Sequence, residues 1–150
     1  MYCVDLPWGC WEIHAQDGAL VTVLPATRPQ MGTPEPLELE AAGQLMEYAQ
    51  GSRKEFSLPL KPHGTAFQQT VWQELSRVPY GCSISYGELA RRIGRPTACR
   101  AVAQAVGANP CLVLLPCHRI LGSDGSVTGF SAGLPLKRQL LTLEGILWKE

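Results

Sequence analysis

Apolar and polar positions alternate along residues 9–15, which is typical of a half-buried strand. Asp17-Gly18 supplies a turn, and residues 19–24 are predicted to return as a second strand. A continuous apolar run from Cys111 to Leu115 predicts a buried strand that ends at Pro116. Residues 25–36 contain four prolines and are expected to form a loop.

Three further segments have apolar residues at intervals of three and four, as helices do. The first covers residues 38–50, the second begins at Thr65 with Gln68 completing a capping box, and the third follows Pro135 and ends at Gly145. Their expected buried faces are Leu39, Ala42, Leu45, Met46 and Ala49; Phe67, Val71, Trp72 and Leu75; and Leu136, Leu140 and Leu143.

Two short helices joined by a tight turn are predicted between residues 85 and 107. Ser85 and Glu88 have capping-box spacing, Gly94-Arg95-Pro96 breaks the first helix, and Thr97 begins the second. This arrangement matches a helix-turn-helix, whose second helix can lie in a DNA groove. The second helix is mostly alanine and valine, so it could make few sequence-specific contacts with DNA bases. Its expected apolar face is Ala98, Ala101, Val102, Ala105 and Val106, and its long polar exceptions are Arg100 and Gln104.

A thiol, an imidazole and a guanidinium are adjacent in Pro116-Cys117-His118-Arg119. A cysteine is nucleophilic as its thiolate, and we expect the neighbouring His and Arg charges to favour that form. The alternative is an ordinary buried cysteine. A nucleophile beside a DNA-docking element that reads little sequence indicates chemistry on DNA itself.

Charge is divided along the chain although the formal net charge is zero. Residues 1–60 carry a net charge of −5 and residues 61–125 carry +4, as expected if only the second part meets phosphate. The six cysteines lack CxxC spacing and are interpreted as reduced thiols, so we expect neither a disulfide nor a metal. No apolar run approaches the roughly 20 residues of a membrane span, and the start lacks a secretory pattern. We expect a cytoplasmic protein, nucleoid-associated if bacterial, with no cofactor and no membrane contact.

The chain resembles the O6-alkylguanine-DNA alkyltransferases, also called methylated-DNA–protein-cysteine methyltransferases. The resemblance extends from about Gly64 to Gly145, whereas residues 1–60 match loosely. The segments that carry it are residues 64–72, 78–81, 84–90, 94–96, 100–102, 107–110, 116–120, 128–130 and 143–145.

This resemblance implies an α+β fold with a small ribonuclease-H-like, three-stranded lobe at residues 1–62. A mainly helical, winged helix-turn-helix-like domain would follow at residues 63–150 and hold the DNA-binding and catalytic functions. Some family members carry zinc in the first lobe, but its ligands have no match here. The implied reaction is a single, irreversible transfer of a methyl or alkyl group from O6-alkylguanine, and also O4-methylthymine, to Cys117. The implied partner is double-stranded DNA with the damaged base flipped out, bound by a monomer.

Candidate site residues follow from the chemistry and from the resemblance. His118 can take the thiol proton through a water, and Glu144 can orient the imidazole. The family position at Tyr86 donates to the guanine and pushes the adjacent phosphate, and Arg100 fills the gap in the base stack. The catalytic candidates are Cys117, His118, Glu144, Tyr86 and Asn109; the DNA-binding candidates are Arg100, Tyr86, Thr97, Ala98, Gln104 and Arg95; the pocket candidates are Phe130, Ser131, Ala132 and Val106.

Some positions depart from the pattern that is frequent in the family. Phe130 stands where tyrosine is frequent, Ala132 where glycine is frequent, and Gln139 where tryptophan is frequent.

Other interpretations of the candidate residues and of the function stay open. Asn109 could tie the docking helix to the Cys117 segment or could simply form an Asn-Pro turn, and Glu144 could be an ordinary helix-end carboxylate. The competing functions are a non-catalytic lesion-binding relative and a cysteine hydrolase that uses Cys117, His118 and Glu144.

Overall fold

The computed structural model describes residues 1–26 and 32–150, which form two compact units. The first unit comprises residues 1–63 and 110–114, and the second comprises residues 64–109 and 115–150. Within the predicted loop at 25–36, residues 27–31 lie outside the described part of the chain. The predicted domain boundary between residues 62 and 63 stays a prediction.

The first unit is built on an antiparallel sheet with the order β1-β2-β3. Its strands are β1 (Tyr2–Leu6), β2 (Gly9–Gln16) and β3 (Ala19–Pro25). The turn between β2 and β3 places Asp17 at φ 52° and Gly18 at φ 78°, a conformation that Gly and Asp tolerate. The strands predicted at 9–15 and 19–24 are therefore confirmed. Strand β1 was not predicted from the sequence.

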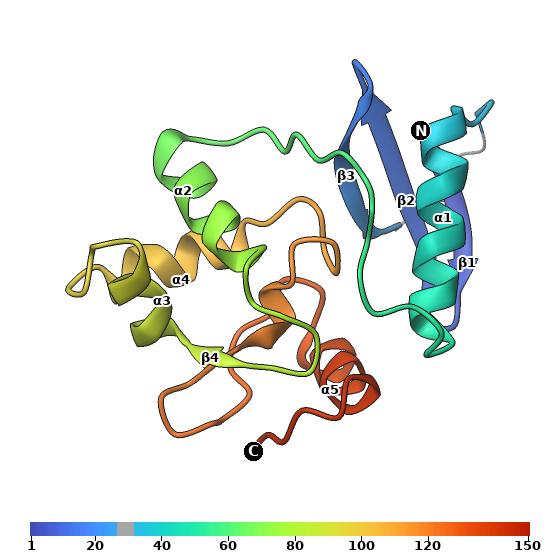
Figure 1. Cartoon of the computed structure of the whole chain (residues 1–150). Coiled ribbons are helices and arrows are strands. Elements are labelled where there is room, and N and C mark those ends of the chain that lie inside the picture. The colour runs from blue at the N-terminus through green and yellow to red at the C-terminus, as the bar shows by residue number, and fades with distance from the viewer. Residues whose placement is uncertain (27–31) are drawn as a thin grey trace. The chain divides into compact units, whose positions relative to one another are not determined.

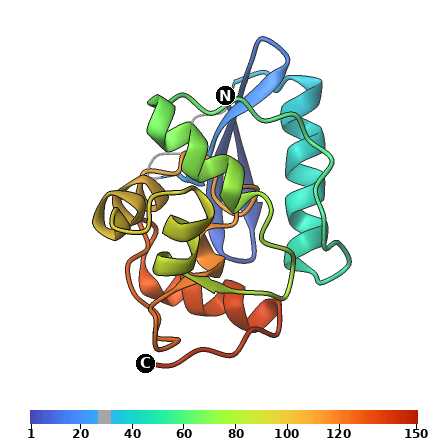
Figure 2. The same cartoon turned by 60° about the vertical axis from the view of Figure 1, so that its left-hand side comes forward.

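Helix α1 (Pro36–Ala49) packs against this sheet, as Figures 1 and 2 show. Ala42 and Leu45 are buried as predicted, but Leu39 is 49% exposed, so its predicted place on the buried face is wrong. Glu38 is buried instead, because its carboxylate accepts hydrogen bonds from the backbone N–H groups of Glu35 and Ala15. The first turn of α1 thus turns a capping carboxylate inward and leaves a leucine in solvent.

The predicted strand at Cys111–Leu115 is wrong, although all five residues are buried. Cys111 forms only an isolated parallel bridge with Val23. Val113 then adopts φ 72°, which turns the chain and ends the extended run. Continuous apolarity indicated burial correctly, but it cannot distinguish a strand from a buried turn.

The second unit contains the helices α2 (Ala66–Leu75), α3 (Tyr86–Arg92) and α4 (Cys99–Gly107), which pack on one another. The capping box of Thr65 and Gln68 is confirmed, with both reciprocal hydrogen bonds present. At α3, Ser85 caps the helix, but the Glu88 carboxylate binds Arg91 and Arg92 instead of completing a box.

Helix α4 begins at Cys99 with Ala98 as its N-cap, two residues later than predicted. Val102, Ala105 and Val106 are buried as expected, whereas Ala101 is exposed. A hydrogen bond of 2.8 Å from the Trp72 indole to the carbonyl of Ala105 fixes α4 against α2. One face of α4 is therefore held in the core, and the opposite face is left for contacts.

The second unit also contains a two-residue parallel pairing of β4 (Ile84–Ser85) with β5 (Ile120–Leu121). Helix α5 (Leu134–Leu143) follows, with Leu140 buried as predicted. Leu136 and Leu143 are only half-buried, and the fully buried residue of its first turn is Lys137. The described part of the chain thus has a mixed α/β fold, and none of its helices has the length and apolarity to cross a membrane.

Candidate active site

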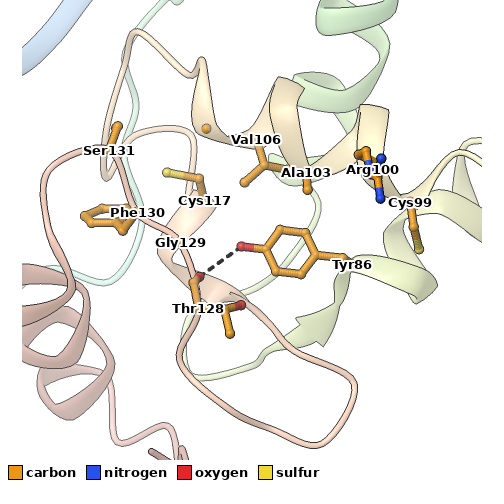
Figure 3. Close-up of a pocket in the computed structure, with 11 residues that line it drawn as sticks. Tyr86, Cys99, Arg100, Ala103, Val106, Cys117, Thr128, Gly129, Phe130 and Ser131 are labelled. Atoms are coloured by element: carbon orange, nitrogen blue, oxygen red, sulfur yellow. Dashed lines mark hydrogen bonds between the residues drawn. The ribbon is translucent and has the colours of Figure 1, made fainter.

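Cys117 begins a short 3₁₀ helix, η1 (Cys117–Arg119), directly after Pro116. Its side chain is 3% exposed and lines a pocket of about 690 Å³ within the second unit. Figure 3 shows the thiol between Val106 of α4 and Phe130 of the loop before α5. A thiol that lines a pocket can contact a small group that enters the pocket from solvent.

The thiol is protonated in the resting protein, because burial raises the pKa of Cys117 to about 11. A hydrogen bond from Asn109 and the charge of Lys137 oppose that increase in the pKa. The expectation that the charges of His118 and Arg119 favour the thiolate is wrong, although a hydrogen bond from the His118 backbone lowers the pKa of the thiol. Burial lowers the pKa of the His118 imidazole, and the Arg119 guanidinium is bound to Glu144.

His118 lies in a fully buried network with Glu144. Its Nε2 is 2.6 Å from one carboxylate oxygen of Glu144, and both side chains are 0% exposed. The pKa of His118 is lowered mainly by burial, against the opposing effect of Glu144. The resting imidazole is therefore neutral and can accept a proton, while the carboxylate can stabilise the cation that results.

Glu144 follows α5 as its C-cap and has several partners. Arg119 donates to both carboxylate oxygens, at 2.8 and 3.0 Å, and the backbone N–H of Gly81 donates to one of them at 3.0 Å. Arg119 also donates to the carbonyl of Val78. A carboxylate at a helix C-terminus is disfavoured by the helix dipole, and these bonds compensate for it. The interpretation of Glu144 as an ordinary exposed carboxylate is excluded by its burial.

Asn109 connects the end of α4 to the Cys117 segment. Its side-chain amide donates to the carbonyl of Leu115 at 2.8 Å, and its side chain also hydrogen-bonds the Cys117 thiol. Asn109 is 3% exposed. The amide thus holds the thiol and its backbone in one place.

Tyr86, at the start of α3, points into the same pocket (Figure 3). Its hydroxyl donates to the carbonyl of Thr128 at 3.2 Å, and burial raises its pKa. Tyr86 therefore keeps its phenolic proton at neutral pH and can act as a hydrogen-bond donor.

The pocket wall contains Val106, Phe130 and Ser131, three of the four pocket residues predicted from the sequence. Ala132 is not one of the lining residues. Gly133 donates to the carbonyl of Phe130 and has φ 97°, so the chain turns towards α5 after Ser131 and carries Ala132 away from the wall. The lining residues that the sequence analysis missed are Cys99, Ala103, Gly107, Thr128 and Gly129.

Of the predicted DNA-binding residues, Arg100 and Tyr86 line the pocket. Arg100 is exposed on α4, and Gln104 is exposed one turn further along. Thr97 and Arg95 are exposed in the turn before α4, where the Arg95 guanidinium lies 5.8 Å from the centre of the Phe67 ring. Ala98 is half-buried. Gln104, Thr97, Arg95 and Ala98 are not among the residues that line the pocket.

Lys137 is the main residue of this site that sequence reasoning missed. It is fully buried, and its charge acts on the Cys117 thiol. Lys137 was not predicted to be buried, because the leucines at positions 136, 140 and 143 were expected to form the apolar face of α5 and a lysine in such a helix is normally assigned to the solvent face. No group of three or more His, Cys, Asp or Glu side chains in the described residues could hold a metal ion. The expected absence of a metal stays a prediction.

The fold and the site define a mixed α/β protein with a buried cysteine in a pocket lined by residues of α3, α4 and the loop before α5. The family model described as 6-O-methylguanine DNA methyltransferase, DNA binding domain, matches residues 66–146. The chain belongs to this family.

Relatives and solved structures agree with that assignment. The chain is 47% identical over 106 residues to a methylated-DNA–protein-cysteine methyltransferase of Methanosarcina acetivorans, covering 71% of this chain and 68% of the relative. It is 56% identical over 100 residues to the Haemophilus influenzae protein of the same name, covering 66% and 56%. The crystal structure of Mycobacterium tuberculosis OGT in complex with DNA is 38% identical, with a TM-score of 0.87 and coverage of 95% of this chain and 91% of that one.

Proposed function

We propose that this chain repairs DNA by moving an alkyl group from the O6 atom of guanine to the sulfur of Cys117. The observation that carries the proposal is the protonated Cys117 thiol in a pocket beside the neutral, carboxylate-bound imidazole of His118. Sulfur is a soft nucleophile and suits attack on an alkyl carbon. The membership of the chain in the methyltransferase family supports the same reaction.

The step balances within this site. His118 accepts the thiol proton through a water, and the thiolate attacks the alkyl carbon, so that a C–S bond forms as the C–O bond breaks. The electron pair of the broken C–O bond leaves on guanine, to which Tyr86 donates a hydrogen bond, and the proton that His118 took from the thiol returns through the water to neutralise the leaving base. The product thioether is stable to water and thiols, so each molecule reacts once and needs no cofactor.

The substrate base must leave the DNA stack before the thiol can reach it. We assign α3 and α4 as the helix-turn-helix of a winged C-terminal domain, and the first unit as its ribonuclease-H-like supporting lobe. Arg100 is exposed at the rim of the pocket and long enough to fill the gap left in the stack. In this assignment Gln104, Thr97, Ala98 and Arg95 face the DNA backbone, and O4-methylthymine is a second substrate.

Two other functions remain to be separated by experiment. A lesion-binding relative without chemistry would flip the base but leave it intact, and the retained Cys117 argues against it. A cysteine hydrolase would use Cys117, His118 and Glu144 on another substrate, but it gives no role to the exposed Arg100.

A duplex carrying O6-methylguanine with a labelled methyl group separates the three functions. The proposal predicts covalent label on the protein and none on Cys117→Ser, which should still bind the duplex. Binding without label would support the lesion-binding alternative, and the absence of both binding and label would reject the proposed function.

A further inference from the structure

Lys137 is a buried cation inside the second unit. Its side chain is 0% exposed, and its ammonium donates to the carbonyls of Ile120, Thr128 and Gly129 at 2.7, 2.8 and 3.3 Å. Burying an ammonium is costly unless its donors are satisfied. These three bonds use all three of its N–H groups, so the site is built to hold a cation there.

The three carbonyls connect Lys137 to the pocket. Thr128 and Gly129 line the pocket, and Ile120 directly follows η1, which bears Cys117. The Lys137 ammonium also lies 5.8 Å from the centre of the Tyr86 ring. Lys137 therefore reaches both the wall and the reactive segment from the core side of α5.

The charge of Lys137 acts on the groups that react. It lowers the pKa of the Cys117 thiol, and a thiolate there would raise the pKa of Lys137 in return. The titratable groups that it faces are Cys117, His118 and Tyr86. The Arg119 charge is bound by the Glu144 carboxylate instead. Burial lowers the pKa of Lys137 to about 8, so it is still mostly charged at neutral pH.

One of the three carbonyls has a second donor. The carbonyl of Thr128 accepts hydrogen bonds from both Lys137 and the Tyr86 hydroxyl. If Tyr86 turns to donate to a bound base, Lys137 continues to satisfy that carbonyl. A buried carbonyl that lost all its donors would cost about 1–3 kcal/mol.

We propose that Lys137 is a positioning residue for alkyl transfer, whose ammonium stabilises the Cys117 thiolate and holds the Thr128–Gly129 wall while Tyr86 moves to the substrate. This inference rests on the proposed function in that Cys117 is taken as the alkyl acceptor. A purely structural lysine would anchor the wall and leave the thiol unaffected.

Two variants separate the charge from the anchoring bonds. Lys137→Met removes both, whereas Lys137→Gln removes the charge and keeps two N–H donors. Arg138→Met is the matched control, since Arg138 lies on the same helix and pairs with Glu150. Reaction of Cys117 with iodoacetamide, followed by mass mapping across pH, reports the thiolate without any DNA. Methyl transfer from an O6-methylguanine duplex is measured in parallel.

Both Lys137 variants should slow alkylation of Cys117 about tenfold near neutral pH, where Lys137 of the wild-type protein is mostly charged. Arg138→Met should keep the wild-type rate. An unchanged alkylation rate near neutral pH in Lys137→Gln, or full rescue by Gln of a loss seen with Met, would overturn the inference. If alkylation slows in the variants while the wild-type protein takes no methyl from DNA, the Lys137 inference stands and the proposed function fails.

Discussion

Cys117 and His118 form a neutral pair in the resting protein, because burial raises the pKa of the thiol and lowers that of the imidazole. The Cys117–His118 pair therefore becomes charged only when the proton moves from sulfur to nitrogen. Glu144 accepts from His118 and is fixed by Arg119, so the imidazolium that forms meets an oriented carboxylate. Such a thiol has a small thiolate fraction at neutral pH and therefore reacts slowly with electrophiles in the absence of substrate.

The lowered pKa of His118 determines the acid limb of the reaction. His118 must be neutral to accept the proton, and its folded pKa lies below the usual 6.5. The rate of methyl transfer should therefore persist below pH 6.5 and fall only at more acidic pH. The limb belongs to the coupled Cys117–His118 pair. Single-turnover rates measured across pH test this, and a limb above pH 6.5 would contradict it.

Replacement of Glu144 should affect both stability and rate. Glu144→Gln leaves the buried Arg119 without a carboxylate, and breaking a buried ion pair costs about 3 kcal/mol. The variant should unfold at lower denaturant concentration and react more slowly, because a neutral amide stabilises an imidazolium less than a carboxylate does. Glu150→Gln removes an exposed carboxylate and is the control. Equal stability and rate in the two variants would mean that the network has no role.

At the scale of elements, α4 combines a buried face with an exposed one that bears Arg100. Arg100→Ala should slow repair in duplex DNA by about tenfold or more and leave the reaction with the free base within about twofold, because stacking is needed only when a base leaves the helix. Arg77→Ala, at an exposed position after α2, is the control. Equal slowing with both substrates would mean that Arg100 acts in folding or in the chemical step and not in base flipping.

The elements predicted correctly are those that depend on residues close together in the sequence. The alternation in β2 and β3, the Asp17-Gly18 turn and the Thr65 capping box each depend on neighbouring residues, and each is present. The strand at 111–115 failed because a single positive φ at Val113 breaks an apolar run, which composition cannot reveal.

In the candidate site, the identity of the residues could be predicted from the sequence, but their protonation states could not. Sequence motifs were enough to name the candidates Cys117, His118, Glu144 and Tyr86. They did not indicate which of these side chains are protonated. Burial sets the pKa of Cys117, and burial depends on packing between distant segments. Lys137 was missed for the same reason, since its partners lie 8 to 17 residues before it in the chain.

Across the whole molecule, the opposite charges of the two halves predict that DNA contacts come from residues 61–125. Duplex affinity should fall by about 40-fold between about 50 and about 200 mM salt if about three phosphates are neutralised. Arg95→Ala should reduce the slope of that dependence by about one, while Lys54→Ala, in the acidic half, should not. Equal slopes for both variants and wild type would place the contacts elsewhere.

Intact-protein mass after incubation with an excess of O6-methylguanine duplex tests the central claim most directly. We expect one added methyl group, about 14 Da, per protein molecule, mapped to Cys117, with no further turnover, because the thioether is stable. Repeated turnover, an unmodified protein, or the added mass on Cys82, Cys99 or Cys111 would contradict the assignment of Cys117 as the alkyl acceptor.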